Sequence, residues 1–234
     1  PPDRDPGDSR NAFMLIRVAP AETTALRAQA RRFGVTLHDL LIALLLRALS
    51  PLAIGRRHES QRREIAVASI VNIRKDFEGD NLRAFGQFLA SMRVMHAVPE
   101  GIALETLAQD VRNATQPIKR AHLYLRTLYA LAAAAGAWRF LSKAQRLRFF
   151  TKHYPAWAGI SMLDVDPSWP AAVRPAQLYT RGVSTGPLTP AVLAISTTST
   201  TLSIGVSWRT AALPAEFANH LQTEIMQCAL QCAV

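Results

Sequence analysis

The stretch "IAVASIVNIRKDFEGD", Ile65 to Asp80, decides how the chain is interpreted. It begins with small and β-branched residues, which are typical of a strand that lies deep in a sheet. It then runs through Asn72 to Arg74, so an arginine leaves the end of a buried strand. One interpretation is that a charge simply marks the point where the strand reaches the surface. The other is that Arg74 is placed to meet a carboxylate, and the rest of the chain must decide between them.

Helices and strands alternate around this stretch. Before this stretch, the patterns predict a strand at 13–18, a helix ending at Gly34 and a buried helix capped by Thr36. After it, they predict a strand at 87–96, a helix at 104–118 and a long basic helical region at 121–151, in which a break near Gly136 stays open. The last third predicts strands at 158–163, 177–181, 191–197 and 201–208, with a turn at 197–200 and a closing helix from Pro214 to Leu230. We therefore expect an α/β (α+β) fold, in which a mixed β-sheet is covered by helices.

The net charge of +10 over 234 residues comes almost entirely from arginine. Arg139, Lys143 and Arg146 follow the i, i+4, i+7 spacing of one helical face and form a candidate basic partner surface. Such a face attracts phosphates, an acidic partner protein or an anionic membrane, and a merely solvated face is the competing interpretation. No helix-turn-helix, zinc-ligand or RNA-binding pattern accompanies the charge, so we expect no nucleic acid partner.

The ends, the apolar runs and the two cysteines bound the class of protein, and the low cysteine content predicts a cytoplasmic protein. Residues 1–12, rich in proline and charge, read as a disordered tail or the remnant of a linker, so the chain is interpreted as a fragment. The longest apolar runs, Leu40–Leu49 and Leu128–Trp138, are shorter than the roughly 20 residues of a membrane span. The two cysteines, Cys228 and Cys232, lie on the closing helix and are interpreted as small core residues.

Catalytic motifs are scarce in this sequence. The six histidines are scattered, and no metal-ligand pair, nucleophile elbow or phosphate-binding loop occurs, so we expect no metal and no bound cofactor. His38 precedes Asp39, but adjacent helical residues point about 100° apart, so His38 is interpreted as a polar residue at a helix start. Composition and motifs alone leave an α/β domain of unstated activity.

Four segments resemble the second half of the condensation-domain and CoA-dependent acyltransferase superfamily. They are "FMLIRVAPAETTALRAQARRFGVTLHDLLIALLLRAL", "IAVASIVNIRKDF", "FGQFLASMRV" and the ending "LSIGVSWRTAALPAEFANHLQTEIMQCAL", in the order of the family. The superfamily includes condensation domains, chloramphenicol acetyltransferase, polyketide-associated acyltransferases and wax-ester or diacylglycerol synthases. The resemblance implies a chloramphenicol acetyltransferase-like half-domain over 13–234.

The resemblance also implies roles for particular residues. In the family, two halves enclose a tunnel, the catalytic H-H-x-x-x-D-G motif belongs to the first half, and an arginine of the second half holds the aspartate of that motif. "VNIR" matches this signature, so Asn72 and Arg74 are implied to support the active site. Gly86, Gln87 and Ser161 are implied to line the tunnel wall or its donor side, although Gln87 stands where the family has asparagine. The D-F-G-W-G signature of peptide-synthetase condensation domains is absent.

Two function classes stay open at this point. In the first, the chain is the second half of an acyltransferase that uses an acyl-CoA or a phosphopantetheine thioester as substrate and a hydroxyl or amine as acceptor. Since no His-His pair occurs, the chain would be inactive without an N-terminal half that carries the motif. In the second, it is a binding module whose basic helix recruits an acidic carrier protein or an anionic lipid. Peripheral membrane contact and a homo-oligomer remain open in both.

Overall fold

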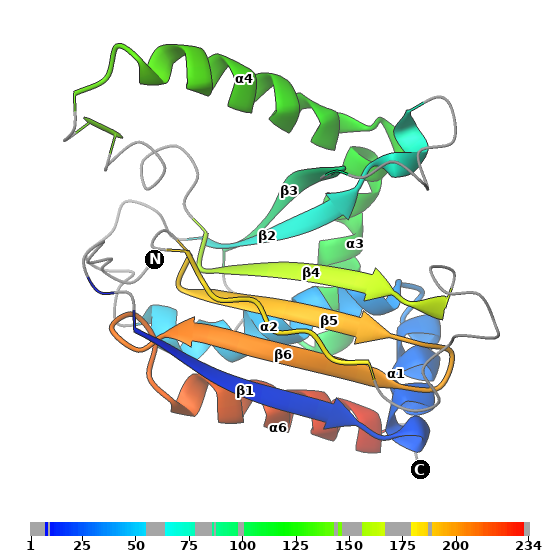
Figure 1. Cartoon of the computed structure of the whole chain (residues 1–234). Coiled ribbons are helices and arrows are strands. Elements are labelled where there is room, and N and C mark those ends of the chain that lie inside the picture. The colour runs from blue at the N-terminus through cyan, green and yellow to red at the C-terminus, as the bar shows by residue number, and fades with distance from the viewer. Residues whose placement is uncertain are drawn as a thin grey trace.

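A six-stranded sheet forms the centre of the protein (Figure 1). The computed structural model describes residues 8, 10–54, 64–77, 86, 88–97, 101–142, 145–146, 156–166, 179–186 and 189–231. The strands are β1 Asn11–Val18, β2 Ile65–Asn72, β3 Leu89–His96, β4 Ala158–Asp164, β5 Ala191–Thr197 and β6 Leu202–Arg209. Their order across the sheet is β1-β6-β5-β4-β2-β3. The expected α/β fold with a mixed sheet is confirmed.

Three neighbouring strands run parallel and the others run antiparallel. β4 lies parallel to both β2 and β5, while β3, β6 and β1 join their neighbours in antiparallel pairs. The parallel strands therefore end at one common edge of the sheet, at Asn72, Asp164 and Thr197. In open α/β sheets this edge is where ligands bind most often.

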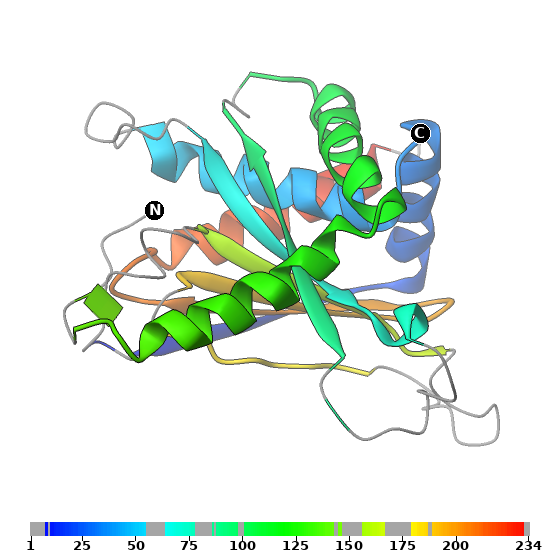
Figure 2. The same ribbon diagram turned by 90° about the horizontal axis from the view of Figure 1, so that it is seen from above.

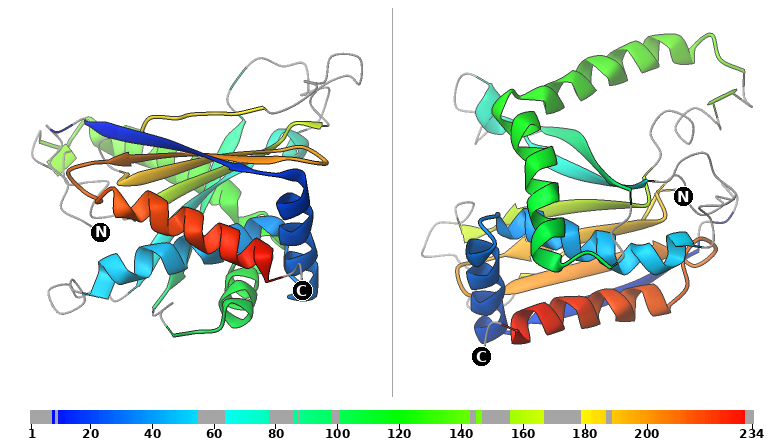
Figure 3. Two further views of the ribbon diagram at one scale, coloured as in Figure 1. Left: turned by 90° about the horizontal axis from the view of Figure 1, so that it is seen from below. Right: turned by 180° about the vertical axis from the view of Figure 1, so that it is seen from behind.

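Four helices cover one face of the sheet (Figure 3). They are α1 Pro20–Arg32, α2 Leu37–Ile54, α3 Leu104–Arg120 and α6 Glu216–Leu230. α2 is the core helix, because its side chains from Leu40 to Leu46 are almost completely buried. Cys228 of α6 is buried in the same core, as the sequence predicted, while Cys232 lies outside the described residues.

The start of α2 is fixed by the cap that the sequence predicted. The Asp39 backbone N–H donates to Thr36 Oγ1 at 3.1 Å, and Thr36 N–H returns a bond to Asp39 Oδ2 at 3.3 Å. This is the reciprocal arrangement of a capping box, with aspartate in the acidic position. Burial alone would raise the pKa of Asp39, but hydrogen bonds from Thr36 and Thr115 and the charge of Lys119 outweigh it and lower that pKa.

Two elements differ from the sequence-based expectation. The strand predicted at 177–181 is wrong for its described part, because Tyr179 to Gly186 form no strand and instead cross the sheet face opposite the four helices. Ser203 Oγ donates to the Tyr179 carbonyl at 2.7 Å, and a Cβ at Gly205 would lie 2.1 Å from the Arg181 carbonyl oxygen. The segment can therefore lie flat on β6 only because Gly205 has no side chain.

The extent of the basic helical region predicted at 121–151 is the second correction. His122 adopts φ +49°, a left-handed conformation that ends α3, and a short turn, η2 Leu123–Leu125, precedes α4 Arg126–Trp138. α4 then ends at Trp138, two residues beyond the break expected near Gly136. Arg139 and Arg146 consequently do not share one continuous helical face, and Lys143 lies outside the described residues.

Candidate functional site

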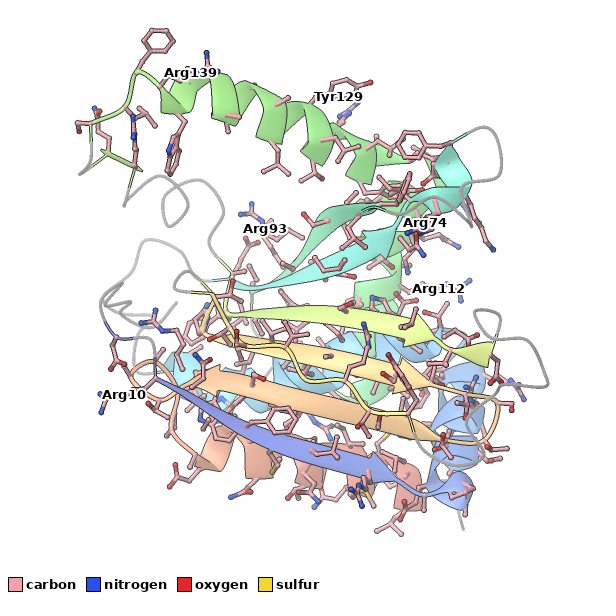
Figure 4. The ribbon with its side chains drawn as sticks, viewed as in Figure 1. Arg10, Arg74, Arg93, Arg112, Tyr129 and Arg139 are labelled. Atoms are coloured by element: carbon pink, nitrogen blue, oxygen red, sulfur yellow. The ribbon has the colours of Figure 1, made fainter. Side chains whose placement is uncertain are left out.

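Arg74 lies at the C-terminal edge of the parallel strands (Figure 4). It opens η1 Arg74–Asp76, the 3-10 turn that follows β2. Its backbone N–H donates to Asn72 Oδ1 at 3.0 Å, which turns the chain out of the strand, and Ile73 N–H donates to the Phe88 carbonyl at 2.9 Å. The two sequence-predicted support residues, Asn72 and Arg74, therefore meet in one turn.

The Arg74 guanidinium is held from two sides. Its Nη2 donates to the Gly86 carbonyl at 3.0 Å, and its Cζ lies 4.3 Å from the centre of the Phe88 ring, within cation–π range. Gly86 has φ +155°, and a Cβ there would lie 3.3 Å from Phe88 Cε2. Arg74 of "VNIR" therefore forms one structural unit with Gly86 and Phe88, and the Arg74 side chain stays partly exposed.

Asp76 connects the same turn to η2 and to His122, which lies just before η2. The Tyr124 hydroxyl lies 3.1 and 3.2 Å from the two carboxylate oxygens of Asp76, and His122 Nδ1 lies 3.0 Å from Oδ1. Burial, followed by the contact with Asp76, raises the pKa of Tyr124. This cluster was missed by sequence reasoning, because Asp76 and Tyr124 are 48 residues apart and belong to no motif.

Ser161 lies one strand away from Arg74. It is paired with Ile70 of β2 and Ala194 of β5, and its carbonyl accepts a hydrogen bond from Arg181 Nη2 at 3.2 Å. The same guanidinium donates to the Ile195 carbonyl at 2.5 Å and to Ser196 Oγ at 3.0 Å. Burial lowers the pKa of Arg181. Arg181 thus pins the crossing segment over β4 and β5, a role that the sequence did not reveal.

Of the remaining predicted residues, the structure describes Arg139 and Arg146, and neither is brought to this site. Gln87 and Lys143 lie outside the described residues. Arg139 lies at the far end of α4 from Arg74, and the Arg146 guanidinium lies 5.8 Å from the centre of the Trp138 ring. Within the described residues, no three His, Cys, Asp or Glu side chains are grouped as a metal site.

His38 lies between α2 and β2, on the face of the sheet that the helices cover. Its Nε2 is 2.8 Å from Ser69 Oγ, while its buried Nδ1 has no hydrogen-bond partner among the described residues. Asp39 instead contacts Thr36, Thr115 and Lys119, which agrees with the interpretation that His38 and Asp39 form no dyad. Desolvation, followed by the positive charge of Lys119, lowers the pKa of His38 to about 4.

The fold is that of one half of condensation domains and related acyltransferases. The chain superposes on the epimerization domain of the third module of tyrocidine synthetase B with a TM-score of 0.62 and 12% identity, over 99% of this chain and 51% of that one. A condensation domain of the enacyloxin polyketide synthase gives a TM-score of 0.61 and 14% identity, over 96% of this chain and 41% of that one. The PapA2 acyl transferase gives a TM-score of 0.61 and 13% identity, over 99% of this chain and 47% of that one.

These similarities establish the fold and its extent. The chain spans about half the length of the solved structures that it matches. No family model matches the sequence, and no curated protein matches it either. The chain thus has the fold of about half of these domains.

Proposed function

We propose that this chain is the second half of a condensation-like acyltransferase. The observation that carries the proposal is that nearly all of the chain matches about half of two synthetase domains and one acyl transferase. The position of Arg74 supports it further, because the arginine lies at the C-terminal edge of the parallel strands and its side chain is partly exposed.

The proposed reaction is acyl transfer from a thioester to a hydroxyl or amine. A general base removes the acceptor proton as the acceptor attacks the thioester carbonyl, and a C–O or C–N bond forms. The C–S bond then breaks, and the thiolate of CoA or phosphopantetheine takes up the proton and leaves as the free thiol. The resemblance assigns that base to an H-H-x-x-x-D-G motif, and this chain has no His-His pair. The base would therefore come from an N-terminal half-domain, and the donor would be an acyl-CoA or an acyl carrier protein thioester.

Arg74 would act by positioning the motif rather than by proton transfer. A guanidinium stays charged at all working pH values, and its planar fork can hold a carboxylate through two hydrogen bonds. Its contacts with Gly86 and Phe88 fix the direction of the fork before any partner is bound. A carboxylate held in this way would keep the neighbouring histidine in place.

An acyl-transfer assay tests this proposal. The 234-residue chain, a half-domain carrying H-H-x-x-x-D-G, and the two joined would each be mixed with acyl-CoA and carrier-bound donors and with hydroxyl and amine acceptors. We expect product only from the joined protein. Turnover by the isolated chain that is lost when one of its own histidines is replaced would contradict the proposal, and so would a joined protein that is inactive with every donor.

A further inference from the structure

α4 is an apolar helix that stands away from the rest of the protein. Figure 1 shows it standing apart from the sheet on the side of β2 and β3, Figure 2 shows it from above, running over these strands, and none of its residues is buried. Its first turns contact the rest of the described protein, where Thr127 Oγ1 donates to the Ser91 carbonyl at 2.7 Å and Leu128 packs against the small cluster that contains Met92 and Tyr124. The rest of the helix therefore presents its side chains outward.

The outward side chains are apolar on more than one side of the helix. No charged residue occurs from Thr127 to Trp138. Tyr129 is 76% exposed, Leu131 is 47% exposed, and Phe140 just beyond the helix is 88% exposed. Apolar helices of 10–14 residues are most often core helices or interfacial segments, and α4 is not buried in the core of this half. At 13 residues it is about 20 Å long, too short to cross a hydrocarbon core.

Positive charge frames this apolar surface. Arg126 begins α4, Arg139 follows it, and Arg146 lies over the Trp138 ring. From Val111 to Leu163 the sequence contains no aspartate or glutamate, while lysine and arginine recur throughout. Aromatic residues near both ends, Tyr129 and Trp138, are typical of segments that lie at the level of lipid headgroups.

We propose that α4, together with Arg139 and Phe140 directly after it, docks on an anionic membrane surface. The apolar side chains would enter the boundary between headgroups and acyl chains, and the arginines would contact lipid phosphates. An acidic protein would be expected to bury one face of the helix, whereas α4 is apolar and exposed on several faces. This inference is independent of acyl transfer and concerns where the protein resides while it acts.

Vesicle co-sedimentation tests the inference with the 234-residue chain. We expect the chain to bind phosphatidylglycerol/phosphatidylcholine vesicles, and to bind pure phosphatidylcholine vesicles at least about tenfold more weakly. Added salt should weaken the binding to the anionic vesicles. A blue shift of Trp138 fluorescence should accompany binding and should be lost in Trp138→Phe.

Matched substitutions separate α4 from general surface effects. Leu131→Glu with Phe140→Glu should reduce binding at least about tenfold, and Arg139→Glu should reduce it less, because a single basic residue near an anionic surface contributes modestly. Leu230→Glu on α6 and Arg31→Glu on α1, both at exposed positions, should leave binding unchanged. The inference is overturned if the chain binds no anionic vesicle or if Leu131→Glu with Phe140→Glu binds vesicles as before. It is also overturned if polyglutamate alone, without lipid, produces the same blue shift of Trp138 fluorescence.

Discussion

Arg74 answers the question raised by the end of β2. The sequence predicts its position, because a run of small and β-branched residues must end where Asn72 begins to turn the chain. It does not predict the partners of the side chain, since a backbone carbonyl such as that of Gly86 leaves no trace in the sequence. The contact with Phe88 is likewise set by the pairing of β2 with β3.

His38 shows how strongly a partner on another element changes a residue. As a helix-start histidine it would be solvated, but Ser69 of β2 and Lys119 of α3 make its site partly buried and positive. The protonated form is therefore disfavoured in the folded state, where the pKa is about 4, compared with about 6.5 for an unfolded histidine.

We predict that this histidine makes the protein less stable in mild acid. Because the unfolded state binds the proton more tightly, the free energy of unfolding should fall as the pH drops from about 6.5 to about 4, by up to roughly 3 kcal/mol. Urea unfolding measured at several pH values checks this. His38→Gln, which can still bond to Ser69, should show a flatter profile over the same range. If the free energy of unfolding of His38→Gln falls with pH as steeply as that of the unchanged protein, groups other than His38 cause the pH dependence and the prediction is wrong.

Contacts between helices depend on a pair that no local pattern predicts. Arg47 of α2 bonds to Glu224 of α6 through both Nε and Nη2, and Glu224 is largely buried. The two residues are 177 positions apart. Apolar periodicity predicts both helices, but it says nothing about which charged residues face each other across them.

Removing one partner of this pair should cost more than removing both. Glu224→Ala leaves the Arg47 charge partly buried, and we expect the free energy of unfolding to fall by about 2 kcal/mol, less than for a fully buried pair because Arg47 is partly exposed. Glu224→Leu with Arg47→Leu leaves no charge and should cost clearly less. Chemical denaturation measures both, and equal losses would contradict this account.

α4 marks the limit of pattern-based prediction for elements. Its residues were assigned to a helical region at 121–151, with a break left open near Gly136, because alanine, leucine and arginine favour helices throughout. The break occurs at His122, whose Nδ1 lies 2.8 Å from the Tyr124 hydroxyl while Tyr124 also contacts Asp76. A long-range contact therefore decides a boundary that propensity alone cannot place.

The sequence patterns predicted the α/β fold class of the whole molecule, and the resemblance predicted the particular half-domain fold. The mixed sheet follows from three apolar strands separated by helices and a closing hairpin of clean period two. The segment at 179–186 was misassigned because its residues suit an extended chain, which can either join a sheet edge or cross a sheet face. Gly205 and Ser203 allow the second arrangement, and that is visible only once β6 is in place.

The central claim is that Arg74 of this half holds a carboxylate of another half. The most direct measurement is a double-mutant cycle on acyl-transfer kcat/KM in the joined protein, with Arg74→Ala and with the motif aspartate replaced by alanine. Each single change should lower kcat/KM about 100-fold or more, since a buried pair broken on one side costs on the order of 3 kcal/mol. Arg31→Ala on the exposed face of α1 serves as the control and should have no effect.

The account predicts that the double variant is no worse than either single one, because both changes remove the same contact. In the isolated chain, Arg74→Ala should change the free energy of unfolding by less than about 1 kcal/mol, since the side chain is partly exposed there. Unchanged turnover in Arg74→Ala, or losses that simply add in the double variant, would contradict the claim.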